Sequence, residues 1–241
     1  MDSGFYSACA GLAARIRTLE VAADNLANMN TAGFRSQTPS FRSFLLSATG
    51  GVAGRAVNTF VGLSGTRLNL APGQVQQTGN DFDLAVEGSG YFAVQTRDGV
   101  KYTRDGQFRL SSDRTLVNAG GDAVLGEGGP LRLPSGQMSV SSDGTVSVDG
   151  ALVGKLQVVE FATGAEPVAV GKSYLEVPEQ DVRATKQATI RQGALEQSNV
   201  DPIGEAVGLV ALQRHAEMLQ RALSMFHSEM NRVAAEDIPR I

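Results

Sequence analysis

Residues 203 to 233 read IGEAVGLVALQRHAEMLQRALSMFHSEMNRV, and the spacing of their apolar residues decides the fold of this end of the chain. These residues recur at alternating steps of three and four, which is the spacing of a coiled-coil seam. Asp201 can cap the first turn and Pro202 suits the first helical position, so the sequence predicts a helix over residues 201–241. The predicted helix start comprises Ser198, Asn199, Asp201 and Pro202, and the predicted C-terminal seam comprises Leu209, Leu212, Ala216, Leu219, Leu223, Phe226 and Met230.

Residues 1–33 repeat this alternation, which predicts a second terminal helix. We expect its seam to pair with the C-terminal seam of the same or a neighbouring subunit. The predicted N-terminal seam comprises Phe5, Cys9, Leu12, Ile16, Leu19, Ala23 and Leu26. Short polar side chains follow, and they can bond to nearby backbone groups where the chain turns at a glycine. We expect this exit-turn motif to comprise Asn25, Asn28, Asn30, Thr31 and Gly33.

The middle of the chain changes from helical to strand periodicity. Residues 34–80 are predicted to form an extended, Gly-rich connector, and residues 47–66 within it have too little apolar surface to order on their own. Residues 81–182 alternate with period two and carry Asp-Gly or Gly-Gly turns every eight to twelve residues, so we expect an all-β domain of hairpins. Residues 183–200 are expected to form a return connector. The predicted fold class is α+β, with long N- and C-terminal coiled-coil-forming helices flanking an all-β, hairpin-rich middle domain.

Composition and charge exclude several classes of protein. The net charge is −4 and the basic residues are scattered, which argues against nucleic-acid binding. No run of 18 apolar residues and no secretory leader occurs, so we expect no membrane insertion and no cleaved signal. Cys9 is the single cysteine, so an internal disulfide is excluded.

Catalytic and metal-binding patterns are weak throughout the sequence. His215 and His227 lie on one predicted helix but about 120° apart around it, so they cannot share a metal ion. Asp81 and Asp83 alternate with apolar residues along a strand, and the Gly88-Ser-Gly90 turn precedes a strand rather than a helix. We therefore expect no catalytic residue, cofactor, metal or small-molecule substrate.

Several segments carry a family resemblance. Asp24–Arg35 resembles the N-terminal signature of the bacterial flagellar rod and hook proteins, and Gly193–Pro202 resembles the stretch that precedes their C-terminal helix. Val86–Val94, Tyr102–Phe108 and Leu116–Asn118 resemble the middle β-domain of the same family. The resemblance spans nearly the whole chain.

This resemblance implies an axial structural protein of the flagellar basal body. Its subunits would polymerise into the hollow rod, with residues 1–33 and 201–241 as helices of the inner tube and the β-domain outside. The partners would be other copies, neighbouring rod proteins and the flagellar export apparatus, which would carry the chain to the periplasmic rod without a cleaved signal. The short middle domain and the charged tail most resemble the proximal-rod member adjoining the distal rod.

Two alternatives remain open from the residues. The first is the distal-rod member of the same family. The second is a secreted β-domain adhesin with a coiled-coil stalk, which would form a closed oligomer and bind carbohydrate or a receptor. An enzyme hidden in the β-domain is a weaker third reading. Open filaments would favour a rod protein, whereas a discrete trimer would favour the stalk.

Overall fold

The computed structural model describes residues 2–45, 59–171, 173–185 and 188–236. The chain divides into two compact units. The helical unit consists of Met1–Leu26, Gln37–Arg67 and Asp201–Ile241, and the β body consists of Ala27–Ser36 and Leu68–Val200. Both units are therefore assembled from segments that lie far apart in the sequence.

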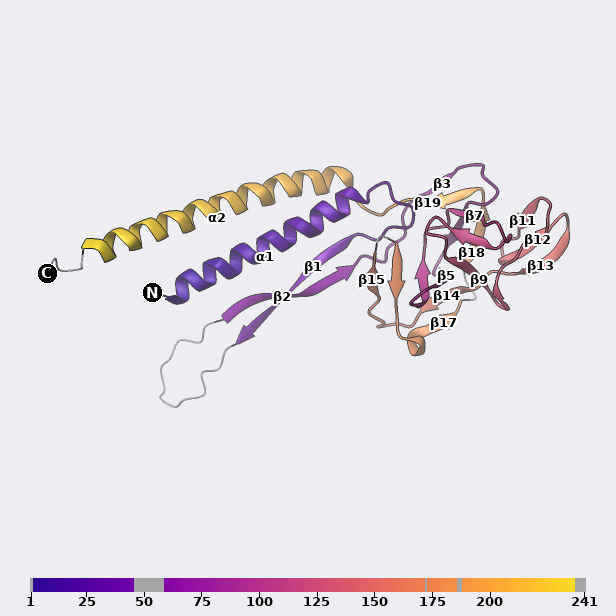
Figure 1. The fold of residues 1–241 in the computed structure, drawn as a ribbon, viewed down its shortest axis with the longest axis horizontal. Helices are drawn as coiled ribbons and strands as arrows, with labels where there is room; N and C mark the ends of the chain where they lie inside the picture. The colour runs from indigo at the N-terminus through magenta and orange to yellow at the C-terminus, as the bar shows by residue number, and fades with distance from the viewer. Residues whose placement is uncertain (1, 46–58, 172, 186–187, 237–241) are drawn as a thin grey trace. The chain divides into compact units, whose positions relative to one another are not determined.

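The helical unit contains helix α1 (Asp2–Ala27), helix α2 (Pro202–Glu236) and the two-stranded sheet of β1 (Gln37–Leu45) and β2 (Thr59–Leu68). The two helices run antiparallel beside each other (Figure 1). α2 begins where the sequence offers a cap, because the Ile203 N–H donates to Asp201 Oδ1 at 3.2 Å. Most of the predicted Gly-rich stretch, residues 47–58, lies outside the described residues, and its last part belongs to β2.

The predicted fold class is wrong in its helical part. α1 has 26 residues and α2 has 35, and they do not form long coiled-coil flanks. A coiled coil buries every seam position in the facing helix, yet Ile16 is 41% exposed and the fully buried positions in the described part of α1 are Ala22 and Asn25. Gly11 and the small residues of both helices leave too little apolar area for a continuous seam within one chain. The middle of the chain is β-rich as expected.

Within its described residues, the β body contains one large sheet and three small ones. The large sheet has ten strands, with the main order β15-β16-β6-β5-β9-β8-β7; β10 adds to β9, β14 to β5, and β17 to β14. Its strands are β5 (Tyr91–Thr96), β6 (Gly99–Thr103), β7 (Phe108–Leu110), β8 (Leu116–Asn118), β9 (Ala123–Gly126), β10 (Gly129–Pro130), β14 (Val158–Phe161), β15 (Val168–Val170), β16 (Tyr174–Glu176) and β17 (Val182–Ala184). The smaller sheets comprise β11 (Met138–Val140), β12 (Thr145–Val148) and β13 (Ala151–Lys155); β4 (Leu84–Glu87) with β18 (Thr189–Gln192); and β3 (Val75–Gln77) with β19 (Ala194–Glu196).

Strand β5 lies at the centre of the core because both of its faces are covered. Phe92 and Val94 belong to one hydrophobic cluster, and Tyr91 and Ala93, which point to the other face, belong to a second. A short one-turn 3-10 helix, Glu179–Asp181, connects β16 to β17. The large sheet is therefore buried on both sides at this strand.

Turn chemistry sets the hairpins of the β body. The Asp149-Gly150 pair between β12 and β13 has φ angles of 49° and 83°, as expected for a two-residue hairpin turn. β12 and β13 pair antiparallel, which confirms the hairpin predicted from the sequence Thr145–Val153. The paired strands β3 and β19 bring the beginning and the end of the body together.

Candidate assembly site

The exit turn, residues 28–36, packs into the β body. The Thr31 N–H donates to the Asn28 carbonyl at 3.1 Å, which tightens the turn after α1. Gly33 has a φ of 66°, and a Cβ at this position would lie 2.3 Å from the backbone carbonyl carbon of Arg104. A side chain is therefore excluded at Gly33 both by the left-handed backbone and by the neighbouring strand end. Phe34 is only 1% exposed and anchors the turn in the body.

Three charged residues meet beneath this turn. Glu196 Oε1 lies 2.6 Å from Arg35 Nη2, and Glu196 Oε2 accepts a hydrogen bond from Arg104 Nη1 at 2.8 Å. Glu196 Oε1 also accepts from the Gly73 N–H at 2.8 Å, and its backbone carbonyl accepts from the Gly33 N–H at 2.8 Å. The Glu196 side chain is 1% exposed, so a single buried carboxylate joins four segments of the chain.

The cluster of Arg35, Arg104 and Glu196 has two positive charges and one negative charge. Two guanidinium groups share one carboxylate, and Arg104 spreads its charge over further acceptors, the carbonyls of Val86 at 2.9 Å and Gly88 at 2.6 Å. The Arg104 guanidinium also lies 4.9 Å from the centre of the Tyr91 ring, a cation–π distance. Arg35 has no hydrogen bond of good geometry from its Nε, Nη1 or Nη2 atoms, so its contact with Glu196 is an ion pair alone. Arg104 is thus the better-satisfied cation of the two.

Asn199 joins the exit turn to the start of the C-terminal helix. Its Oδ1 accepts from the Ser36 N–H at 2.7 Å, across 163 residues of sequence. Its Nδ2 donates to the carbonyls of Asn69 and Ala71, at 2.8 Å each. The chain therefore enters and leaves the β body at adjacent points, both fixed by one amide side chain.

The Asp105 carboxyl, next to Arg104 in the sequence, is also partly buried. Burial raises the pKa of Asp105 above its ordinary value, and the Asp83 carboxylate adds to the rise, while the hydrogen bond from the Gln107 N–H opposes it. Asp105 follows Arg104 directly, and its backbone nitrogen would lie 2.3 Å from a Cβ at Gly33. The exit turn therefore closely approaches the residues that follow β6, and one of these residues, Asp105, has a partly buried carboxyl group.

Asn25, predicted as part of the exit turn, lies in the helical unit. Its Oδ1 accepts from the Gln37 N–H at 2.8 Å and its Nδ2 donates to the Gln37 carbonyl at 2.9 Å. The same Nδ2 lies 3.0 Å from Glu205 Oε1 of α2. This buried amide thus connects α1, β1 and α2.

The predicted seams are only partly covered by their own chain. In α2, Ala216 is buried and the leucines are half-buried; these are Leu209, Leu212, Leu219 and Leu223. In α1, Ile16 is exposed and the remaining described seam residues are half-buried; these are Cys9, Leu12, Leu19, Ala23 and Leu26. The side chains of Phe5, Phe226 and Met230 lie outside the described residues. Among the other predicted residues, Asn28 is buried, Asn30 is exposed, and Ser198 Oγ accepts from the Val200 N–H at 3.3 Å.

Sequence reasoning missed the charge cluster, although the signal was present. Arg35, Arg104 and Glu196 each lie within one of the segments that carry the family resemblance. A long charged residue in each of three motifs from distant parts of the chain is a hint that they meet, because buried charges need partners.

The described residues contain no group of three or more His, Cys, Asp or Glu side chains placed to hold a metal ion. His215 is exposed on α2, and the side chain of His227 is not among those described. No helix within the described ranges is long and apolar enough to cross a membrane.

Three family models match this chain. A model described as "Flagella basal body rod protein" matches residues 5–35, and one described as "Flagellar hook protein FlgE/F/G D1 domain" matches residues 85–148. A third, "Flagellar basal body rod FlgEFG protein C-terminal", matches residues 191–235. The first match covers residues 28–35 of the exit turn, the second contains Arg104, and the third contains Glu196 and all but the last residue of α2.

Curated proteins similar to this chain match it over most of their own length. The flagellar basal-body rod protein FlgF of Caulobacter vibrioides is 31% identical, with all of both chains covered. The FlgF of Mesorhizobium japonicum is 34% identical over 90% of each chain. The flagellar basal-body rod protein FlgG of Bacillus subtilis is 32% identical over 89% of this chain and 91% of its own.

Proposed function

This chain belongs to the family of bacterial flagellar basal-body rod proteins, and from that membership we propose that it polymerises through its two terminal helices into a hollow axial drive shaft. Its role as a structural subunit of the basal-body rod, predicted from the sequence motifs, is confirmed by relatives that match over the full length. It acts in the flagellar basal body, together with other rod proteins.

One observation supports the helices as the assembling part. The connections to α1 and α2 leave the β body side by side, because Asn199 Oδ1 accepts from the Ser36 N–H at 2.7 Å and the Asn199 N–H donates to the Phe34 carbonyl at 3.4 Å. The Glu196 cluster fixes this junction from beneath. Both terminal helices follow from adjacent chain ends of the body, and in this proposal the apolar faces left half-covered in one chain are completed by the next.

In this proposal, the residues of both seams and of the exit turn make or position the contacts between subunits. The partners are other copies and neighbouring rod proteins, and the flagellar export apparatus delivers the chain. We place the chain in the proximal rod, adjoining the distal rod; the alternative is the distal-rod member of the same family. The protein acts as a non-enzymatic structural subunit in this proposal.

The test is complementation of a strain that lacks this gene, with secretion measured separately from assembly. Leu219→Asp places a carboxylate on the half-buried face of α2, and we expect it to be secreted but absent from purified basal bodies, with loss of swimming. The matched control is Gln220→Asp, which changes an exposed residue next to Leu219. A strain that carries this variant should swim. Equal swimming by both variants would contradict assembly through α2. Discrete trimers of the purified wild-type chain, instead of open filaments, would favour the adhesin alternative.

A further inference from the structure

The exit turn is held to the rest of the β body mainly by one short segment near the end of that body. The Gly33 N–H donates to the Glu196 carbonyl at 2.8 Å, and the Phe34 carbonyl accepts from the Asn199 N–H at 3.4 Å. Arg35 Nη2 lies 2.6 Å from Glu196 Oε1. Among the described residues, these three members of the exit turn contact distant segments through polar groups of Glu196 and Asn199 alone.

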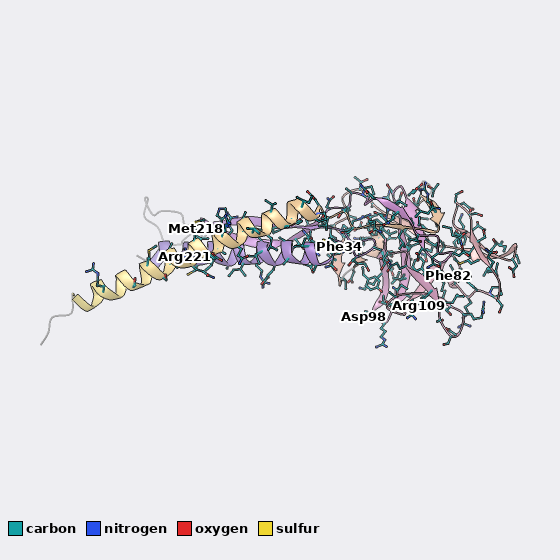
Figure 2. The ribbon with its side chains drawn as sticks, turned by 90° about the horizontal axis from the view of Figure 1, so that it is seen from above. Phe34, Phe82, Asp98, Arg109, Met218 and Arg221 are labelled. Atoms are coloured by element: carbon teal, nitrogen blue, oxygen red, sulfur yellow. The ribbon has the colours of Figure 1, made fainter. Side chains whose placement is uncertain are left out.

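Ser36, the last residue of the exit turn, divides its bonds between this segment and a second one. Its N–H donates to Asn199 Oδ1 at 2.7 Å, and its carbonyl accepts from the Asn69 N–H at 2.8 Å. Asn199 Nδ2 in turn donates to the Asn69 carbonyl at 2.8 Å, so these three residues are tied together. Phe34, which Figure 2 labels, is 1% exposed and adds apolar burial to these bonds.

The segment that holds the exit turn is residues 194–199, and we call it the latch. The latch has partners of its own in the β body, because its first part is β19, which pairs with β3. The Gln197 N–H donates to the Gln74 carbonyl at 2.8 Å, and Glu196 Oε1 accepts from the Gly73 N–H at 2.8 Å. The latch can therefore form without the exit turn, whereas the exit turn cannot make its bonds without the latch.

Charge makes this dependence strict. The Arg35 side chain is 2% exposed in the docked exit turn, and its counter-charge is Glu196 of the latch. The other charged member of the buried cluster is the Arg104 guanidinium, which is also a cation. Burial of Phe34 favours docking, but a buried charge without a partner costs more than one buried aromatic side chain contributes. The exit turn therefore stays undocked until Glu196 is in place.

We infer that the latch controls the docking of the exit turn: residues 28–36 bind to the β body only when residues 194–199 have paired with it. Arg35 precedes Glu196 by 161 residues, and a chain is synthesised from its N-terminus, so the exit turn exists long before its latch. Docking of the exit turn therefore marks a β body whose last strand is in place. The inference does not depend on polymerisation, since all of these contacts lie within one β body.

Gly73→Ala displaces the latch without removing a bond to the exit turn. A Cβ at Gly73 would lie 1.9 Å from the Gln197 carbonyl oxygen, and the φ of Gly73 is not positive, so alanine acts through this clash rather than through backbone strain. In residue-resolved hydrogen exchange of the full-length chain, this variant should speed exchange of the Gly33 N–H at least tenfold. Exchange in β5 should stay within twofold of wild type.

Asn199→Ala should speed exchange of the Gly33 N–H by a similar factor, although Gly33 does not bond to Asn199. The matched control is Gln192→Ala. The Gln192 amide also accepts from one backbone N–H, that of Val140 at 2.9 Å, and donates to two carbonyls, but none of these groups belongs to the exit turn. This control should leave Gly33 within twofold of wild type.

Three results of this experiment would overturn the inference. Unchanged exchange of Gly33 in either latch variant would show that the exit turn docks without the latch. Equal acceleration by Gln192→Ala would show that the effect is not specific to the latch. Equal acceleration in β5 would show that the body opens as a whole, with no separate latch.

Refolding tests the order of the two events. In pulsed hydrogen exchange during refolding of the full-length chain, the Gly33 N–H should gain protection together with the Gln197 N–H or after it, and Gly73→Ala should delay both. Protection of Gly33 before Gln197, or a delay of Gln197 alone in the variant, would refute control by the latch.

Discussion

Glu196→Gln is the sharpest perturbation of the buried charge cluster within the β body. The substitution keeps the size of the side chain but removes the one carboxylate shared by two buried guanidinium groups. Glutamine can still accept from one side, either from Gly73 N–H or from Arg104 Nη1, and its amide NH₂ must then face another donor. One charge-assisted hydrogen bond, worth about 1.5–3 kcal/mol, is lost, and two buried cations are left without a counter-charge.

The expected loss of unfolding free energy is about 3–5 kcal/mol, the usual cost of removing one partner from a buried ion pair. For a domain of this size, that loss corresponds to a fall in melting temperature on the order of 10 °C. Urea unfolding of the purified full chain, followed by circular dichroism, measures the free energy, and an unchanged m-value would show that the exposed surface is the same.

Glu87→Gln is the matched control. Glu87 Oε1 lies 2.8 Å from Arg191 Nη2, the same separation as in the Glu196–Arg104 pair, but the two side chains are 38% and 57% exposed. An exposed pair contributes about 0–1 kcal/mol, so this variant should be close to wild type. If the two variants differ by less than about 1 kcal/mol, burial of the Glu196 cluster does not stabilise the junction and the reasoning is refuted.

The remaining predictions concern the same junction. Arg104→Met should lower the unfolding free energy by about 1–2 kcal/mol more than Arg35→Met, because Arg104 donates to three oxygen acceptors whereas Arg35 makes an ion pair only; equal losses in urea unfolding would contradict this ranking. Gly33→Ala should destabilise the body more than Gly121→Ala: both positions have positive φ, which costs about 1–2 kcal/mol, but a Cβ at Gly33 would also meet the backbone of Arg104 at 2.3 Å, whereas Gly121 has open space. If the melting temperature of Gly33→Ala is not lower than that of Gly121→Ala, the turn relaxes away from the body and the steric argument is wrong. Because burial raises the folded pKa of Asp105, the folded chain holds that proton more tightly than the unfolded chain does, so stability falls as pH rises from about 3.8 through the raised value. Asp105→Asn should therefore be more stable than wild type at neutral pH and equal to it below the ordinary carboxyl pKa; parallel stability curves across pH would refute this.

Local sequence patterns were sufficient for the start of α2, for one hairpin of the β body and for the family, but not for the strands in residues 34–80 and 183–200. Asp149-Gly150 fixed a two-residue hairpin because both residues adopt positive φ, and Asp201 with Pro202 marked the start of α2 because each satisfies or avoids an unpaired backbone N–H there. The motifs around residues 24–35, 102–108 and 193–202 carried the family, and each lies within a segment that a model of this family matches.

The tertiary structure decided which of these residues meet and which faces are covered. The motifs around Arg35 and Glu196 each carry a charge, but they do not say that these two residues pair, because the contact joins segments 161 residues apart and depends on how the body folds. Periodicity gave the phase of each helix, but α2 has apolar residues on two opposite sides, and a period of 3.6 cannot tell which side its own chain buries. The structure buries Ala216 with the leucine side and leaves Met218 exposed, since the Asn25–Glu205 hydrogen bond fixes the face of α2 that meets α1.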